Sequence, residues 1–130
     1  MASVVVRHAS AGKPDDWDGD DRLRPLDPHG RRQAAELVAR LDQLEVRRIV
    51  SSPFTRCVQT VEPLGEALGL SVELDDRLAE GAGQAAYALV QEAGIVCCTH
   101  GDVVSDLLGR GLDTGSAVEL RAGEVVREIP

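Results

Sequence analysis

The sequence predicts an α/β protein: a three-layer α/β/α sandwich with a mostly parallel central sheet. Short runs of β-branched residues alternate along the chain with segments in which apolar residues recur at helical spacing, which is typical of layered α/β folds. Hydrophobic residues make up 43% of the chain, but aromatic residues only 2%. The core must therefore consist of valine, leucine, isoleucine and alanine, as is usual for strands buried on both faces. Because the chain has 130 residues, we expect one domain spanning residues 1–130.

The first strand and the first helix have the clearest boundaries. Residues 4–6 are three valines, which favour an extended chain because their side chains branch at Cβ. A long polar loop follows over residues 12–24. Asp27 and Pro28 then suit the cap and the first position of a helix whose apolar residues recur as far as Leu44. The remaining pattern predicts strands at 46–50, 70–74 and 95–99, helices at 55–68, 84–92 and 103–108, and a C-terminal hairpin that pairs 117–120 with 125–129.

The charge and the cysteines exclude several classes of protein. The formal net charge of -8 argues against partners that are nucleic-acid polymers or anionic membranes, both of which attract basic surfaces. An odd number of cysteines, with Cys97 and Cys98 adjacent, argues against a disulfide framework and indicates a reducing compartment. The N-terminus has no basic segment followed by an apolar one, and no apolar run approaches the length of a membrane span. We therefore expect a cytoplasmic protein, whose oligomeric state the sequence leaves open.

Chemistry-bearing side chains follow the ends of three predicted strands. Arg7 and His8 end the first strand, His100 ends the strand at 95–99, and Arg56 lies in the first turn of the helix after 46–50. The carboxyl ends of parallel strands form the crevice in which α/β proteins bind ligands, and adjacent strands lie about 4.8 Å apart. Two guanidiniums and two imidazoles gathered there suit a phosphoryl group, whose charged oxygens match the arginine fork.

These motifs, taken in chain order, resemble those of the histidine phosphatase (phosphoglycerate mutase-like) superfamily. The resemblance covers nearly the whole chain. A stretch near the first helix is similar to the short SixA-like branch and to the phosphatase module that some proteins fuse to Nudix domains. The motifs are Arg7-His8-Ala9, Ser52-Pro53 with Arg56, and Thr99-His100-Gly101, and the branch-like stretch is Arg24-Pro25-Leu26-Asp27 with Gly30 and Gln33-Ala34.

The resemblance implies a mechanism that needs no metal or other cofactor. His8 would attack phosphorus as a neutral imidazole and form a phosphohistidine, which water would then hydrolyse. Arg7, Arg56 and His100, together with Gly101, would bind the phosphate oxygens and stabilise their charge, which is where most of the catalysis of phosphoryl transfer arises.

The residue that protonates the leaving group is less well defined. The family places a carboxylate after the third strand, and Glu80 is the nearest match, with a solvated loop glutamate as the alternative. Asp102 is a second candidate, although an acidic residue is also favoured there by the helix dipole. Ala9 stands where the family has a glycine, and we expect its Cβ to reduce the room beside the phosphate.

The expected function is that of a SixA-like protein phosphohistidine phosphatase. A phosphoramidate leaving group needs less help from an acid than an alkoxide does, and the chain lacks the long insertions that grip phosphosugars in larger members. The partner would then be a phosphorylated protein. The alternatives are a phosphatase of small phosphate esters, such as nucleotides or phosphosugars, and a non-catalytic phosphate-binding module.

Other polar and aromatic residues have more ordinary interpretations. Trp17 is either a packed lid over the core or a wall of the substrate pocket. His29 is expected to be solvated, and Cys57 is either packed or a reactive thiol. The sequence has no C-x-x-C or H-x-x-x-H pair, which argues against zinc. The aspartates of the polar loop do not have the spacing of a calcium loop.

Overall fold

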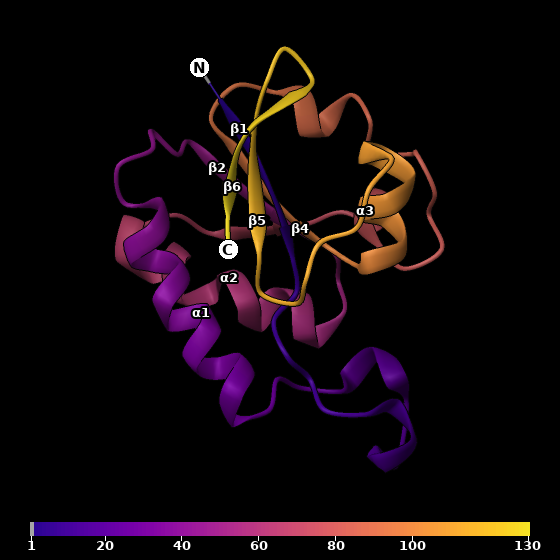
Figure 1. Ribbon diagram of the computed structural model, residues 1–130. Coiled ribbons are helices and arrows are strands. Elements are labelled where there is room, and N and C mark those ends of the chain that lie inside the picture. The colour runs from indigo at the N-terminus through magenta and orange to yellow at the C-terminus, as the bar shows by residue number, and fades with distance from the viewer. Residues whose placement is uncertain (1) are drawn as a thin grey trace.

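A six-stranded mixed sheet forms the middle layer of the protein, as the computed structural model of residues 2–130 shows (Figure 1). The strand order is β3-β2-β4-β1-β5-β6. The first four strands are parallel to one another, and the two C-terminal strands form an antiparallel hairpin beside β1. The predicted fold class is therefore confirmed. The strands are β1 (Ser3–Arg7), β2 (Arg48–Ser51), β3 (Val72–Leu74), β4 (Ile95–Thr99), β5 (Ala117–Arg121) and β6 (Glu124–Ile129).

Helices cover both faces of this sheet. The helices α1 (Pro28–Leu41) and α2 (Thr55–Leu68) pack side by side on one face, and α3 (Gly101–Leu108) lies on the other (Figure 1). No helix within residues 2–130 is long and apolar enough to cross a membrane. Four short 3₁₀ helices occur in the connections, at Pro14–Asp16, Asp21–Leu23, Asp76–Leu78 and Leu89–Gln91.

The alternation of side chains along the strands divides the core into two clusters. Val5 and Cys97 face α3 and pack with its residues Val103, Val104 and Leu107. The neighbours of these strand residues point to the opposite face, because successive residues of a strand alternate between the two faces of a sheet. That second cluster includes Val4, Val6, Val96 and Cys98 with Leu37 and Leu41 of α1 and Val61 and Leu64 of α2.

The ends of the helices and the hairpin follow local rules. The Asp27 side chain caps α1 by accepting a hydrogen bond from the Gly30 N–H at 2.7 Å. Gly69 ends α2 with a φ of 68°, in the left-handed region. Ala122 and Gly123 have φ values of 52° and 79°, and two successive positive values form the turn that suits the twist of a hairpin.

One predicted element is wrong, and several boundaries differ. Residues 84–92 do not form an α-helix; they make successive turns that end in the 3₁₀ helix Leu89–Gln91. Helical stability comes mainly from tertiary packing, and here these turns already bury Ala86, Leu89 and Val90 against the sheet. The strand β3 starts at Val72 rather than at residue 70, because the Leu70 N–H instead closes the end of α2 by donating to the Gly65 carbonyl at 2.9 Å. Elsewhere α1 ends at Leu41, β2 covers Arg48–Ser51, and α3 begins at Gly101.

The register of the parallel strands determines where the site lies. Arg7 is the partner of Thr99 across β1 and β4, and Ser51 is the partner of Cys98 across β2 and β4. The residues that directly follow these strands are therefore neighbours at the carboxyl edge of the sheet. They are His8 after β1, Ser52 after β2 and His100 after β4. The start of α1 packs on the segment just after His8, since a Cβ on Gly30 would lie 1.9 Å from the Ser10 carbonyl oxygen.

We expect Gly30→Ala to destabilise the protein by roughly 1–3 kcal/mol, because the added methyl group must displace the Ser10 backbone. The measurement is the free energy of unfolding in urea. Gly111→Ala is the matched control, because a Cβ on Gly111 meets nothing within 4 Å. If both variants unfolded at the wild-type urea concentration, the close packing of α1 on this segment would be wrong.

Candidate active site

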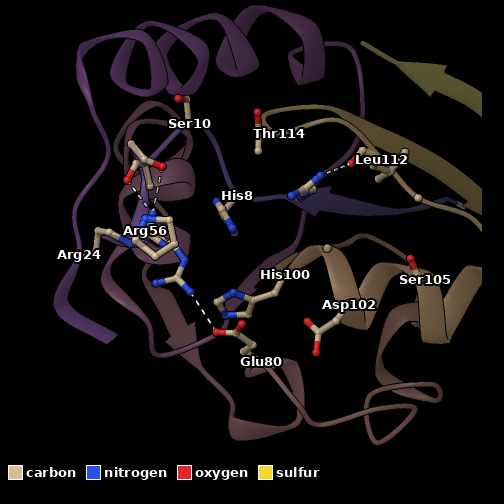
Figure 2. Close-up of a pocket in the computed structure, with 16 residues that line it drawn as sticks. His8, Ser10, Arg24, Arg56, Glu80, His100, Asp102, Ser105, Leu112 and Thr114 are labelled. Atoms are coloured by element: carbon tan, nitrogen blue, oxygen red, sulfur yellow. Dashed lines mark hydrogen bonds and ion pairs between the residues drawn. The ribbon is translucent and has the colours of Figure 1, made fainter. Parts of the chain in front are cut away.

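A cavity of about 590 Å³ opens at the carboxyl edge of the sheet (Figure 2). The structure brings together in its walls all the residues that the sequence proposes for the site. These are Arg7, His8, Arg56, Glu80, His100 and Gly101, together with Asp102.

His8 presents one ring nitrogen to the cavity in its unprotonated form. Its Nδ1 lies 2.8 Å from the Ala9 carbonyl oxygen, and because a carbonyl only accepts, Nδ1 carries the hydrogen and Nε2 the lone pair. Burial lowers the pKa of His8 from its usual 6.5 to about 4; the hydrogen bond to Ala9 opposes this shift, while positive charge at His100, Arg56 and Arg7 adds to it. His8 is thus a neutral imidazole at physiological pH, as a nucleophile must be.

Arg7 is held against the start of α3. Its Nη1 donates to the Leu112 carbonyl at 2.7 Å, and its guanidinium lies so close to Gly101 that a Cβ there would be 3.0 Å from both Cζ and Nε. Gly101 therefore supports the site by leaving room for Arg7, a more specific role than the phosphate contact expected from the sequence.

Arg56 is only 2% exposed and is fixed by groups from two loops. Its Nη1 donates to the Asp21 carbonyl at 2.8 Å, and its Nη2 donates to the carboxylates of Asp21 at 3.2 Å and Glu80 at 3.1 Å. The guanidinium lies over the face of the Phe54 ring, with Cζ 5.0 Å from the ring centre. These contacts leave little freedom in the position of the charge.

His100 lies beside His8, with ring centres 5.5 Å apart (Figure 2). It is 3% exposed. Its Nε2 faces the Ser52 hydroxyl at 2.8 Å and the Cys57 sulfur at 3.5 Å, and the Phe54 ring packs edge-on against the imidazole. Its Nδ1 therefore remains for a ligand.

Three buried nitrogen atoms in these walls have no hydrogen-bond partner within residues 2–130. They are Nε of Arg7, Nε of Arg56 and Nδ1 of His100. Buried donors are rarely left unpaired, and three on side chains that surround one cavity indicate a ligand rich in acceptor oxygens. The unprotonated nitrogen of His8 lies among them, so the arrangement suits transfer of a phosphoryl group.

The two candidate acids both reach the cavity, and each already accepts a hydrogen bond. Glu80, whose side chain is 51% exposed, pairs with Arg56, and the Asp102 carboxylate accepts from the Gly81 N–H at 2.8 Å. In this structure both carboxylates therefore act as hydrogen-bond acceptors. Within residues 2–130, no cluster of histidine, cysteine and acidic side chains could hold a metal ion.

The expectation that Ala9 narrows the phosphate site is wrong. Its side chain is fully buried in a small apolar cluster with Ala11, Leu26 and Ala34, and it does not line the cavity. Its N–H donates to the Thr60 hydroxyl at 2.9 Å. The added methyl group therefore fills core space and leaves the phosphate side of the chain unobstructed.

Trp17 fits neither of its two interpretations. It is 37% exposed, its indole N–H donates to the Asp20 carbonyl at 2.9 Å, and it lines a separate hollow of about 230 Å³ beside the main cavity. His29 is exposed, as expected, and Cys97 and Cys98 are buried.

Several residues that hold the site could not be identified from the sequence. Asp21 is one of five aspartates in the polar loop over residues 12–24, and nothing in their spacing distinguishes the one that reaches Arg56. Leu112 contributes only a carbonyl, which leaves no trace in a sequence. Ser52 was quoted as part of a motif, but its contact with His100 needs the pairing of β2 with β4 to be known. Arg24, also quoted only in a motif, is a further wall of the cavity.

The chain is similar in sequence to several known proteins. Residues 4–88 match the model of the histidine phosphatase superfamily (branch 1). An 8-oxo-(d)GTP phosphatase of Mycolicibacterium smegmatis is 38% identical over 114 residues, which are 81% of this chain and 35% of that protein. A probable phosphoglycerate mutase GpmB of Klebsiella pneumoniae is 35% identical over 81 residues, which are 58% of this chain and 36% of that protein. The chain thus spans about a third of the length of these curated relatives.

Among solved structures, the protein histidine phosphatase SixA complexed with tungstate has the same fold. The TM-score is 0.80 at 24% sequence identity, and the superposition covers 99% of this chain and 96% of that chain.

Gly101→Ala should weaken binding of inorganic phosphate by about tenfold, because its methyl group displaces the Arg7 guanidinium and misaligns a charged hydrogen bond. Titration calorimetry measures the dissociation constant. The same substitution should have no further effect in an Arg7→Ala background, since its action passes through that arginine. An equal loss in both backgrounds would show that Gly101 acts on the ligand directly.

His8 should titrate at about pH 4 in the folded protein, a value that NMR of the ring carbons can measure, with His8→Gln identifying the signal. The unfolded ring takes up its proton near 6.5. Stability should therefore fall as the pH drops from about 6.5 to about 4, because the unfolded state binds more protons in that window. A folded midpoint near 6.5 would contradict the buried, neutral nucleophile.

Proposed function

Because the chain belongs to the histidine phosphatase superfamily, we propose that it is a metal-independent phosphatase that works through a phosphohistidine on His8. One observation carries this proposal. Three buried, unpaired donors on Arg7, Arg56 and His100 surround the unprotonated nitrogen of a neutral histidine. Such an arrangement supplies both a nucleophile and fixed donors for the charge that develops on phosphoryl oxygens.

The reaction has two steps. Nε2 of His8 forms a bond to phosphorus while the bond from phosphorus to the leaving group breaks, and the leaving group takes a proton from water or a nearby acid. Water then attacks the phosphohistidine, the N–P bond breaks, and orthophosphate leaves with His8 restored. Arg7, Arg56 and His100 bind the equatorial oxygens in both steps, where positioning and charge stabilisation supply most of the catalysis.

The substrate that we propose first is a phosphohistidine side chain of another protein. Glu80 and Asp102 are both engaged as acceptors, so the site offers no carboxylic acid poised to protonate an alkoxide. A phosphoramidate leaves through nitrogen, which accepts a proton readily from solvent. The three free cysteines, all buried, support a reducing compartment, and we propose the cytoplasm.

A phosphatase of nucleotides is the second candidate. It is favoured by the relative in Mycolicibacterium smegmatis, which is 38% identical over 81% of this chain and is named for 8-oxo-(d)GTP. When the substrate is a nucleoside monophosphate, the leaving group departs as an alkoxide, which needs a proton. In that case Glu80 would have to leave Arg56 and serve as the acid, or Asp102 would take the role.

The test is release of phosphate in the presence of EDTA from a phosphohistidine peptide, an aryl phosphate, and a panel of nucleotides and phosphosugars. We expect turnover that resists EDTA, is lost in His8→Ala and persists in His29→Ala, whose side chain is exposed. Acid-labile phosphate should also accumulate on His8 during turnover. The preferred substrate decides between the two candidates, and binding without turnover of any of them would make the protein a phosphate-binding module.

A further inference from the structure

Two buried side chains lie behind His100, on the side away from the cavity. The Ser52 hydroxyl is 2.8 Å and the Cys57 sulfur 3.5 Å from its Nε2, and both residues are fully buried. Ser52 follows β2 and Cys57 lies in the first turn of α2, so two elements converge on one ring nitrogen. The nitrogen on the other side, Nδ1, has no hydrogen-bond partner within residues 2–130.

We propose that Ser52 and Cys57 are positioning residues that fix the protonation pattern of His100, so that Nδ1 always presents an N–H to the phosphoryl group. The inference rests on the proposed function and adds to it two residues that act through His100.

In a neutral ring, the two side chains select the tautomer. The Ser52 oxygen accepts from the Phe54 N–H at 3.3 Å, which leaves its own O–H free to donate to Nε2 of His100. The Cys57 thiol can donate to the same nitrogen. When these groups donate to Nε2, that nitrogen has no hydrogen of its own, and the ring proton is on Nδ1.

In a cationic ring, both nitrogens carry hydrogens, and the same two partners serve as acceptors for Nε2–H. Burial acts to raise the pKa of Cys57, but hydrogen bonds with Cys98, His100 and Ser52, together with the charge interaction with His100, outweigh it and lower the pKa to about 6. The sulfur is therefore ready to take the accepting role. In either state of the ring, Nδ1–H faces the ligand.

Other charged groups around the ring do not provide this control. Arg7 and His8 reach the cavity from β1, Arg56 from α2, Glu80 from the loop after β3, and Asp102 from α3. The structure shows no hydrogen bond from any of them to His100. Without Ser52 and Cys57, a neutral imidazole would be free to place its proton on Nε2, and the Nδ1 lone pair would repel a phosphate oxygen.

The experiment compares Ser52→Ala, Cys57→Ala and the double variant by two measurements. Nitrogen-15 NMR at about pH 8 reports which ring nitrogen of His100 is protonated, and calorimetry with inorganic phosphate and with tungstate reports affinity. We expect the double variant to lose the Nδ1–H tautomer and to bind both anions about tenfold more weakly, because one charge-assisted hydrogen bond is lost. Each single variant keeps one of the two partners of Nε2, so its loss of the Nδ1–H tautomer and of anion affinity should be smaller.

The chain provides matched controls. Ser51→Ala removes a neighbouring buried hydroxyl that bonds only to the Ser52 carbonyl, and Cys97→Ala removes a buried thiol that faces the opposite side of the sheet. Both should keep the tautomer and the affinity. Cys57→Ser placed in the Ser52→Ala background should restore them, since it returns a hydroxyl beside Nε2.

Persistence of the Nδ1–H tautomer in the double variant would overturn the proposal, as would unchanged anion affinity once that tautomer is lost. If the double variant fails to fold, the rescue by Cys57→Ser over Ser52→Ala decides the question, and absence of rescue counts against it. Neither measurement requires turnover. Failure of the proposed function, meaning no turnover of any substrate and no phosphate on His8, is therefore distinguishable from failure of this inference.

Discussion

The parallel pairing of β1 with β4 is the interaction on which the site depends. Opposite Arg7 lies Thr99, and this one register places two imidazoles beside each other at the end of the sheet. A shift of one residue would turn each following side chain to the opposite face. It would send His8 and His100 into different layers and would also expose valines that now fill the core. The apolar packing that stabilises the fold therefore also sets the geometry of the chemistry.

Around His8 and His100, rigid neighbouring groups hold the side chains of the site in place, without long insertions. The carbonyls of Leu112 and Asp21 hold the two arginines, the Ala9 carbonyl orients the nucleophile, and Gly101 leaves space for a guanidinium. Most of these contacts are made by the backbone, whose position follows from the sheet and from the helices that begin at its edge. A protein with a strongly negative net charge thus maintains a local cluster of positive side chains.

The sequence was sufficient to predict the layers, the mostly parallel character of the sheet and the residues that meet at its carboxyl edge. Those predictions rest on the periodicity of apolar residues, which is a local property of the sequence. They also rest on the rule that the carboxyl ends of parallel strands meet at one edge, which holds for parallel sheets in general. The failures have a different cause. The helix expected at 84–92 depended on tertiary packing, the effect of Ala9 depended on the direction of one Cβ, and the partners of Arg56 and His100 come from segments far away in the chain. Contacts of that kind are set by three-dimensional proximity, which spacing along a sequence does not encode.

In the proposed phosphatase reaction, the pairing of Arg56 with Asp21 and Glu80 has a consequence for the release of the product. An incoming phosphoryl group meets a guanidinium whose charge is already shared with two carboxylates, so its binding energy is the difference between two sets of ion pairs. Arginines without such partners would hold orthophosphate tightly and would make its departure slow. The two carboxylates compete with orthophosphate for Arg56, so the product is bound less tightly. They pair with the arginine again as the phosphate leaves. In that reaction the carboxylates would act on the rate of phosphate release, and the loop that carries Asp21 would contribute to turnover without contacting the reacting atoms.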